Sequence, residues 1–311
     1  MPLPQGWLGP DRNFLGLDEP WCHPDRAGVR VLPAPYEHTS SYIQGSDRGP
    51  AAIIEASQQV ELYDEILRCE PYREWGGIAT AAPLDLDDQV DRAAVEAIEA
   101  FVRPHVDASR FVLTLTGEHT GALGAIRAHA KRWPDLCVVQ IDAHGDLRHA
   151  YQGNPFSHAS VMARVVEDGL PLVQVGIRSI SAEEIALIER TKTISTFFAS
   201  TICDPSGPYE GRAANWVPDV VRACSGPVYL TFDCDGLDAS LVPALGTPEP
   251  GGLGWYDTLA LVTALARGPG IVGMDISELA PIEGLVAPQF AIARLIYRIL
   301  GRIVAARRTR V

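Results

Sequence analysis

Short apolar runs recur along this chain, and longer segments with helical periodicity separate most of them. Each run is nearly continuous in its hydrophobicity, as expected for a strand whose two faces are both covered. Alternation of such strands with helices predicts an α/β fold in which a mostly parallel sheet carries helices on both faces. The predicted strands are residues 28–33, 111–116, 136–141, 172–176, 228–232 and 270–274, and the predicted helices are 50–67, 90–102, 120–133, 158–168, 181–190, 214–224, 256–267 and 286–303.

The alternation begins only after residue 27. Residues 1–27 are rich in Pro, Trp and charge and show no clear period, so we expect an irregular N-terminal arm. Beyond the arm there is no internal repeat and no low-complexity linker, and the Pro/Gly-rich stretch 243–254 is short enough to be a shaped loop. A chain of 311 residues is compatible with one large domain, which we expect to span residues 28–311.

Charge and cysteine content narrow the class of protein. The chain carries 39 acidic and 26 basic residues, a formal net charge of −13. Nucleic acids select clustered Lys and Arg, so this balance argues against a nucleic-acid partner and is compatible with a small cationic substrate. No stretch reaches the roughly 18 apolar residues of a membrane span, and the N-terminus lacks the pattern of a secretory signal. The six cysteines suggest no disulfide framework, so we expect a cytoplasmic protein without a membrane partner.

Three polar segments directly follow predicted strands, at the edge of a parallel sheet where ligands commonly bind. The segments are TGEHT (116–120), QIDAHGD (140–146) and FDCDGLD (232–238). Two of them carry polar residues at every second position, a spacing that places side chains on one side of an extended chain. The candidate ligands in these segments are His119, Asp142, His144, Asp146, Asp233 and Asp235.

Taken singly, each segment is weak evidence for a site, because a DxD pair is commonly a turn or capping element. Together they supply four carboxylates and two imidazoles, and burying such groups costs several kcal/mol unless a partner compensates them. One ion with positions left open for chemistry does not need six protein ligands, so two ions that share bridging carboxylates fit better. The excess of carboxylates and the lack of thiolate ligands favour Mn²⁺ over Zn²⁺.

The three segments resemble the metal signature of the ureohydrolase family, which includes arginase and agmatinase. That signature combines a GG[DE]H[ST] turn, a DAHxD segment and a [ST]FDxDxxDP segment. Here Thr116 replaces the first glycine and Ala239 replaces the proline, and neither stands at a ligand position. The resemblance extends from about residue 28 to about residue 303. It implies a three-layer α/β/α sandwich, the arginase-like fold, around a mostly parallel sheet of about eight strands.

The resemblance also implies two Mn²⁺ ions in each subunit and a homo-oligomer, usually a trimer or a hexamer. Asp142 and Asp233 would bridge the two ions. The implied ligand sets are His119, Asp142, Asp146 and Asp233 for one ion, and Asp142, His144, Asp233 and Asp235 for the other. Two such ions lower the pKa of a bridging water, which can then attack a guanidinium carbon and release urea.

Two further residues match positions with roles in the family. Glu278 matches the glutamate that pairs with the substrate guanidinium, a planar cation that a carboxylate can meet with two charge-assisted hydrogen bonds. His158 matches the histidine of the family's SH[AG] loop, which shuttles a proton, a task suited to imidazole. Without the resemblance, a surface carboxylate and a polar residue at a helix N-terminus are the simpler interpretations. Asp275 has the opposite parity to Glu278, so we expect it to be structural.

Several features favour agmatine as the substrate, cleaved to putrescine and urea. Arginases carry a longer, Thr- and Asn-rich stretch between the positions of Asp142 and His158, which holds the amino-acid end of arginine, and that stretch is absent here. The run 246–252 (GTPEPGG) resembles the agmatinase form of its loop. The alternatives are a guanidinobutyrase or guanidinopropionase, in which Arg148 would pair with the substrate carboxylate, a formimidoylglutamase, a deacetylase of related fold, or a catalytically silent homologue.

Overall fold

The strands of this protein form one sheet. In the computed structural model, which describes residues 3–309, the strands are β1 (Val29–Ala34), β2 (Ile78–Thr80), β3 (Phe111–Thr116), β4 (Cys137–Ile141), β5 (Leu172–Ile177), β6 (Ile194–Phe198), β7 (Val228–Asp233) and β8 (Ile271–Ser277). Their order is β2-β1-β3-β8-β7-β4-β5-β6, and each neighbouring pair is parallel. The eight strands and their parallel pairing confirm the predicted fold class.

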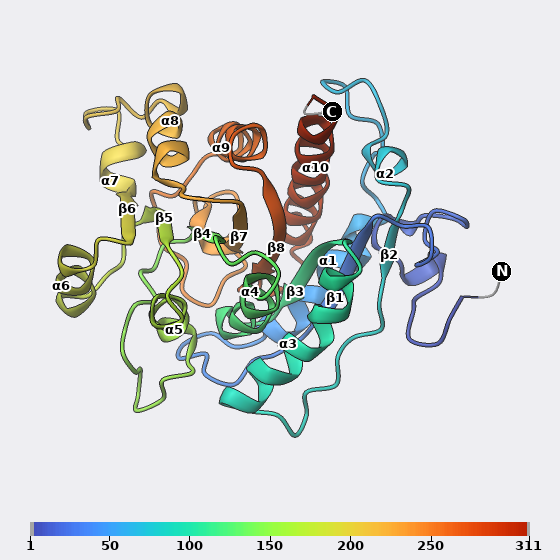
Figure 1. Ribbon diagram of the computed structural model, residues 1–311, viewed down its shortest axis with the longest axis horizontal. Helices are drawn as coiled ribbons and strands as arrows, with labels where there is room; N and C mark the ends of the chain where they lie inside the picture. The colour runs from blue at the N-terminus through green and yellow to red at the C-terminus, as the bar shows by residue number, and fades with distance from the viewer. Residues whose placement is uncertain (1–2, 310–311) are drawn as a thin grey trace.

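Helices cover both faces of the sheet. They are α1 (Gly49–Ser57), α2 (Pro71–Glu74), α3 (Asp91–Asp107), α4 (Ala122–Ala130), α5 (Val161–Glu167), α6 (Ala182–Arg190), α7 (Ala199–Ile202), α8 (Ala213–Ala223), α9 (Trp255–Arg267) and α10 (Ala287–Thr309). In Figure 1, α8, α9 and α10 lie above the sheet and α3, α4 and α5 lie below it. Within residues 3–309, no helix is long and apolar enough to cross a membrane.

The two faces explain the continuous apolar runs. Side chains alternate across a strand, so in β3 Phe111 and Leu113 join one apolar cluster and Val112 joins the other. Both faces of the strand are therefore buried, and each second residue packs beneath a different helical layer. The observed architecture is the three-layer sandwich expected from the sequence.

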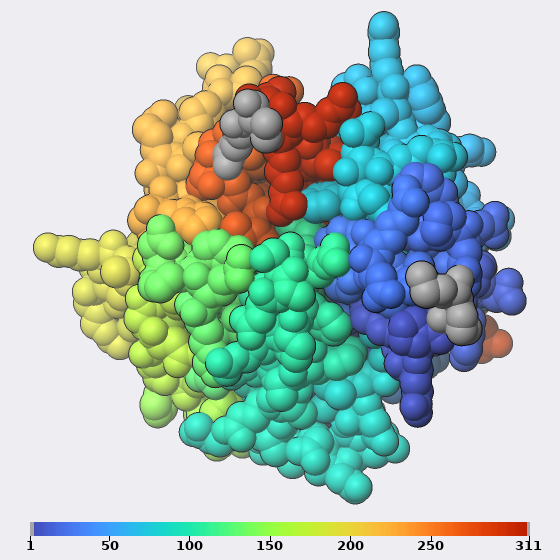
Figure 2. Space-filling view, turned by 45° about the vertical axis from the view of Figure 1, so that its right-hand side comes forward, coloured from blue at the N-terminus to red at the C-terminus, as the bar shows by residue number. Residues whose placement is uncertain are grey.

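Over residues 3–27 the N-terminal arm contains short 3₁₀ helices, Pro10–Arg12 and Phe14–Gly16, and no longer element. It covers the edge of the sheet at β2. The backbone N–H of Leu8 donates to the carbonyl of Thr80 at 2.9 Å. The side chain of Asn13 donates to the carbonyl of Ile78 at 3.1 Å and accepts from the N–H of Thr80 at 2.9 Å. These contacts satisfy backbone groups that an edge strand would otherwise leave open. In Figure 2 the dark-blue arm lies beside the cyan segments that follow α1.

The predicted helix 50–67 is too long, because α1 ends at Ser57. The segment after α1 is irregular around Asp64, whose carboxylate accepts hydrogen bonds from backbone N–H groups two and three residues further on. The same carboxylate contacts Arg298 at 2.9 Å and Arg302 at 3.3 Å on α10. Side-chain bonds of this kind compete with helical ones, and the contacts to α10 hold the segment in its irregular path.

Two strands escaped prediction, and both lie at the edges of the sheet. β2 has three residues, all of them buried, and β6 has five residues, of which four are only partly buried. A strand this short, or one this exposed, does not produce the continuous apolar run by which the central strands are found. The four-residue helices α2 and α7 were missed for the same reason of length.

Candidate metal centre

The topology of the sheet brings the predicted site residues together. β3, β8, β7 and β4 are consecutive neighbours in the sheet. His119 follows β3, Glu278 follows β8, Asp233 ends β7 and Asp142 follows β4. Because parallel strands end at the same edge, four segments that are far apart in sequence converge there.

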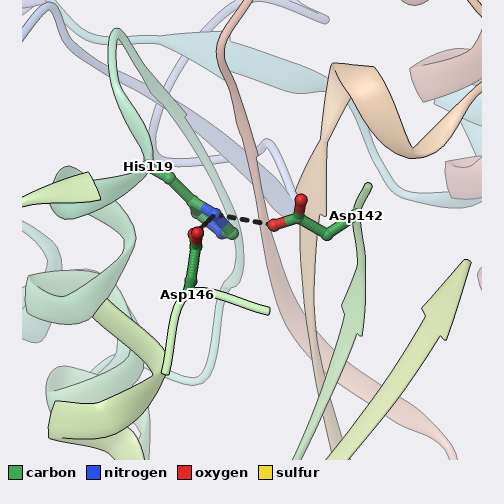
Figure 3. A group of neighbouring side chains, drawn as sticks. All are labelled: His119, Asp142 and Asp146. Atoms are coloured by element: carbon green, nitrogen blue, oxygen red, sulfur yellow. Dashed lines mark hydrogen bonds and ion pairs between the residues drawn. The ribbon is translucent and has the colours of Figure 1, made fainter. Parts of the chain in front are cut away.

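The first cluster is centred on the imidazole of His119. Its Nδ1 lies 3.1 Å from Asp142 Oδ2, 2.9 Å from Asp146 Oδ2 and 3.5 Å from Asp233 Oδ2. Figure 3 shows His119 between Asp142 and Asp146, with the two contacts drawn as dashed lines. All four side chains are buried. Three carboxylates therefore point at one ring nitrogen in a part of the protein shielded from solvent.

The second cluster shares Asp142 with the first. Its other oxygen, Oδ1, lies 3.7 Å from His144 Nδ1, and that nitrogen lies 2.9 Å from Asp235 Oδ2. Within each of the two groups, His119–Asp142–Asp146 and Asp142–His144–Asp235, potential ligand atoms lie within 4.8 Å of one another. The structure thus brings all six sequence-predicted ligands into one place, with Asp142 common to both groups.

These side chains converge through turns and not through the extended geometry inferred from their spacing. Asp142 accepts the N–H of His144 at 2.6 Å, and Asp233 accepts the N–H of Asp235 at 2.9 Å. Asp235 lies in a 3₁₀ turn, and Asp146 has a positive φ of 52°. Strained backbone of this kind is found where the surroundings over-determine a functional geometry.

A hydroxyl behind the site sets the orientation of His119. Its Nε2 lies 2.8 Å from Thr231 Oγ1, and that hydroxyl donates to Asp275 Oδ1 at 3.0 Å. The hydroxyl has one proton, which goes to Asp275, so it must accept the proton on Nε2 of His119. Nδ1 is then the ring nitrogen that faces the carboxylates, and it would offer its lone pair to a bound metal ion, as in metal-ligating histidines whose other nitrogen is held by a hydrogen bond. Asp275 supports the site from behind, as expected of a structural residue.

A row of polar side chains, two buried and one half-buried, was missed in the sequence analysis and supports Asp142. Gln140 Nε2 donates to Asp142 Oδ2 at 2.7 Å, Gln174 Nε2 donates to Gln140 Oε1 at 2.7 Å, and Thr196 Oγ1 donates to Gln174 Oε1 at 2.8 Å. The three residues are direct neighbours on β4, β5 and β6. The sequence offered one signal, a single glutamine inside each of the apolar runs of β4 and β5. The partners of these glutamines became visible only once the register between the strands was known.

Crowding of the carboxylates changes their affinity for protons. Burial, and next the charges of Asp235 and Asp146, raise the pKa of Asp142 to about 7. Burial, and next Asp235 and Asp142, raise the pKa of Asp233 well above its usual range. The imidazoles therefore do not neutralise the cluster. A buried set of four carboxylates and two imidazoles is the donor set that suits a divalent cation.

Burial is the largest single influence on the pKa of both His144 and Asp235, but the hydrogen bonds and charges around them together outweigh it. Burial lowers the pKa of His144, but the hydrogen bond to Asp235 and the nearby carboxylate charges outweigh it and raise that pKa to about 10. Likewise burial raises the pKa of Asp235, but the bond to His144 lowers it to about 2.

Arg178 is another residue that the sequence analysis missed. Its guanidinium donates only to backbone carbonyls, and it joins the end of β5 to the turn of Asp235 and to the Pro/Gly-rich loop 243–254. The acceptors are the carbonyls of Gly176, Asp235, Leu237, Glu249 and Pro250. The planar fork of an arginine can hold several backbone groups at once, so this residue ties the loop to the turn that carries Asp235.

An opening above the two clusters is lined by the predicted catalytic residues. An inner pocket of about 30 Å³ is bordered by Asp146, Asp235, His158 and Glu278. Glu278 is partly exposed there and has a positive φ of 65°. Its Oε1 accepts the N–H of His119 at 2.6 Å. Burial, and next the charge of Glu118, raise its pKa well above the usual range.

The inner pocket continues into an outer cavity of about 220 Å³. Arg148, Tyr151 and Glu184 line this cavity, and His158 borders both spaces. The guanidinium of Arg148 lies 5.5 Å from the centre of the Tyr151 ring, and its Nε lies 4.0 Å from Glu184 Oε2. Arg148 therefore lines the cavity through which a substrate would reach the clusters.

Comparison with known proteins agrees with this geometry. The sequence model of the arginase family matches residues 27–301. This chain belongs to the arginase family. It is 38% identical over 307 residues to an N(1)-aminopropylagmatine ureohydrolase of Synechocystis sp., covering 97% of each chain. It is 32% identical over 271 residues to an agmatinase of Bacillus cereus, covering 84% of this chain and 87% of the relative.

Among solved structures, the agmatine ureohydrolase of Thermoplasma volcanium aligns with a TM-score of 0.79 and 26% sequence identity, over 99% of this chain and 98% of that one. An arginase of Bacillus subtilis, 22% identical, shares the fold with a TM-score of 0.72. As a member of this family, the chain is a ureohydrolase, an enzyme that hydrolyses C–N bonds of guanidino compounds.

Proposed function

We propose that this ureohydrolase uses two Mn²⁺ ions to release urea from a linear guanidino amine, and that agmatine, giving putrescine, is the simplest such substrate. The observation that carries the proposal is the sharing of Asp142 by two groups of potential ligands directly beneath a pocket lined by Glu278. Two metal ions would require a negative, buried donor set. A cationic guanidinium would require a carboxylate in the pocket.

The proposed ligands follow from the two clusters. His119, Asp146 and one oxygen of Asp142 would hold one ion, and His144, Asp235 and the other oxygen of Asp142 would hold the second. Asp233 would complete both sets. When bound, two such ions supply Lewis acidity and a water that ionises near neutral pH. The four carboxylates offer oxygen ligands, which suit Mn²⁺, so we propose Mn²⁺ as the metal.

Glu278 would bind and orient the substrate. One of its oxygens is held by the N–H of His119, so the carboxylate has a fixed direction at the floor of the inner pocket. A carboxylate in this position can accept N–H groups of the guanidinium and keep its carbon above the clusters. His158 borders the same pocket and would give a proton to the departing amine nitrogen, which must leave as a neutral amine.

N(1)-aminopropylagmatine is a second candidate substrate. Relatives from Synechocystis sp. and Thermus thermophilus carry that name. The outer cavity of about 220 Å³ leaves room for a substituent that extends from the guanidino amine. Both candidates lack an α-carboxylate, in keeping with the absence of the arginase stretch between Asp142 and His158.

The test is urea release by the purified, Mn²⁺-loaded enzyme from agmatine, N(1)-aminopropylagmatine, arginine, guanidinobutyrate and guanidinopropionate. A kcat/KM for either amine at least tenfold above those for the acids is expected. Preference for a guanidino acid would contradict the proposed substrate class and would make Arg148 the first candidate to bind its carboxylate. Urea from none of these compounds, with two metals bound, would contradict the function itself.

We also propose that residues 28–311 act as one catalytic domain in a cytoplasmic homo-oligomer. All six cysteines are free, which suits a reducing compartment. Apolar side chains are exposed at four-residue intervals at Ile282, Val286 and Phe290. Exposed apolar side chains that lie close in sequence are found at subunit interfaces. Light scattering of the purified protein would test assembly, and a monomer at micromolar concentration would contradict it.

A further inference from the structure

Glu118 is fully buried beside His119, and neither the metal clusters nor the substrate pocket explains it. Its carboxylate accepts four hydrogen bonds. Oε2 accepts the N–H of His38 at 2.8 Å and that of Thr39 at 2.5 Å, and Oε1 accepts the hydroxyls of Thr39 at 2.7 Å and Thr120 at 2.6 Å. All four partners are hydrogen-bond donors, so the carboxylate of Glu118 acts only as an acceptor.

The hydroxyl of Thr39 connects this carboxylate to His158. Thr39 Oγ1 donates its single proton to Glu118, and it accepts the backbone N–H of His158 at 3.1 Å. The same oxygen lies 3.0 Å from His158 Nδ1. A hydroxyl can donate once and accept twice. With its proton already given to Glu118, Thr39 can only accept at this third contact, so Nδ1 of His158 must carry a proton.

The consequence concerns the other ring nitrogen. A neutral imidazole with its proton on Nδ1 has its lone pair on Nε2. Since Nδ1 is occupied by Thr39, Nε2 is the nitrogen left for the pocket that His158 borders. Tyr151 packs edge-on against the ring, with centroids 5.7 Å apart and planes at 74°. The ring is therefore held at one nitrogen by a hydrogen bond and against one face by an aromatic side chain.

We propose that Thr39 and Glu118 are positioning residues that hold His158 with its proton on Nδ1, so that Nε2 exchanges protons with the substrate. In the step concerned, protonated His158 gives the Nε2 proton to the departing amine. The C–N electron pair of the substrate takes up that proton as the bond breaks. The other proton stays on Nδ1 of His158, where it is donated to Thr39 Oγ1, and water restores the proton on Nε2. The inference rests on the proposed role of His158.

Two substitutions at Thr39 separate positioning from packing. Thr39→Val keeps the shape of the side chain and removes the hydroxyl, whereas Thr39→Ser keeps the hydroxyl. In Mn²⁺-loaded enzyme, Thr39→Val should lower kcat by about tenfold or more, toward the roughly 10²-fold loss expected for His158→Ala. Metal content and KM should stay near wild type. Thr39→Ser should restore most of kcat, and equal kcat in the Val and wild-type enzymes would overturn the proposal.

A measurement independent of activity decides the tautomer. Nitrogen-15 NMR of histidine-labelled protein distinguishes protonation at Nδ1 from protonation at Nε2. The sample would hold Zn²⁺, because Mn²⁺ broadens nearby signals, and loss of a signal in His158→Gln would assign it. Protonation at Nδ1 in the wild type, lost in Thr39→Val, is expected, and protonation at Nε2 in the wild type would refute the inference. If His158→Ala kept full kcat, the role of His158 would fail, while the NMR result would still decide its tautomer.

Discussion

The backbone N–H of His119 donates a 2.6 Å hydrogen bond to Oε1 of Glu278. In return, the N–H of Glu278 donates to the carbonyl of Gly117 at 2.7 Å. The turn that presents a proposed metal ligand and the residue proposed to bind the guanidinium are therefore joined in both directions. Because Glu278 also has a positive φ, its carboxylate is held in place by this turn and not by its own backbone preference.

Replacing Glu278 with Gln should weaken substrate capture without loss of metal. The amide keeps the shape of the side chain but removes the charge that faces the guanidinium. A hydrogen bond to a charged group contributes about 1.5–3 kcal/mol, so kcat/KM for agmatine should fall roughly 10- to 150-fold. Steady-state kinetics and metal analysis would check this. Glu283→Gln, at an exposed position in the same loop, is the control, and a wild-type kcat/KM in Glu278→Gln would rule out the assignment.

Metal removal should make stability fall as the pH rises. The folded-state pKa is about 7 for Asp142 and about 10 for His144, each above its ordinary value. Such groups stabilise the fold fully below the ordinary pKa and lose that contribution as the pH passes the folded value. The metal-free Tm should therefore be lower at pH 9 than at pH 6, and Mn²⁺ should raise Tm more at pH 9 because it replaces the protons.

Asp142→Asn is the control for that experiment. It removes one crowded carboxylate, so the fall in metal-free Tm between pH 6 and pH 9 should become smaller, and bound metal and urea release should both be lost. Thermal unfolding of the chelator-treated proteins would show the difference. A metal-free wild-type Tm that rises over this interval would contradict the electrostatic account of the cluster.

Gln140→Leu should weaken metal binding although Gln140 is not a proposed ligand. The substitution removes the donor that fixes Asp142 Oδ2 and leaves the amide of Gln174 without one partner. Loss of a partner that orients a metal ligand typically lowers metal affinity 10- to 100-fold. We expect a decrease of this size in the affinity for Mn²⁺, measured by titration calorimetry. The exposed substitution Gln59→Leu should have no effect, and equal affinities in both variants would exclude a supporting role for Gln140.

Arg178→Lys should destabilise the loop that covers the second cluster. An ammonium cannot reproduce the planar fork that holds carbonyls on both sides of the Asp235 turn. Leaving several carbonyls without donors should cost about 1–3 kcal/mol of unfolding free energy, measured by chemical denaturation. Arg212→Lys, whose side chain is 72% exposed, is the matched control. Equal stability of the two variants would mean that Arg178 does not hold the loop.

The central strands and the convergence of the six proposed metal ligands could be predicted from the sequence because each carries its own local pattern. A strand covered on both faces must be continuously apolar, and polar residues placed directly after it need a reason to be there. Gln140, Gln174 and Thr196 could not be joined in advance, since the contacts depend on the register between strands. The predicted helix 50–67 ends before Asp64, and the contacts of that carboxylate with two arginines of α10, more than two hundred residues away, could not be seen in a local pattern.

The sequence by itself determined the layered α/β fold, the central strands and the six residues that gather at their ends, because periodicity and local chemistry express these features within a few residues. Only the tertiary structure decided that Asp142 belongs to both clusters, that Thr231 contacts Nε2 of His119, and that the hydroxyl of Thr39 lies against Nδ1 of His158. Each of these depends on distances between segments that meet only after the parallel strands have aligned. Hydrogen bonds form at about 3 Å. The order of residues along the chain does not give the distance between two separate segments with that precision.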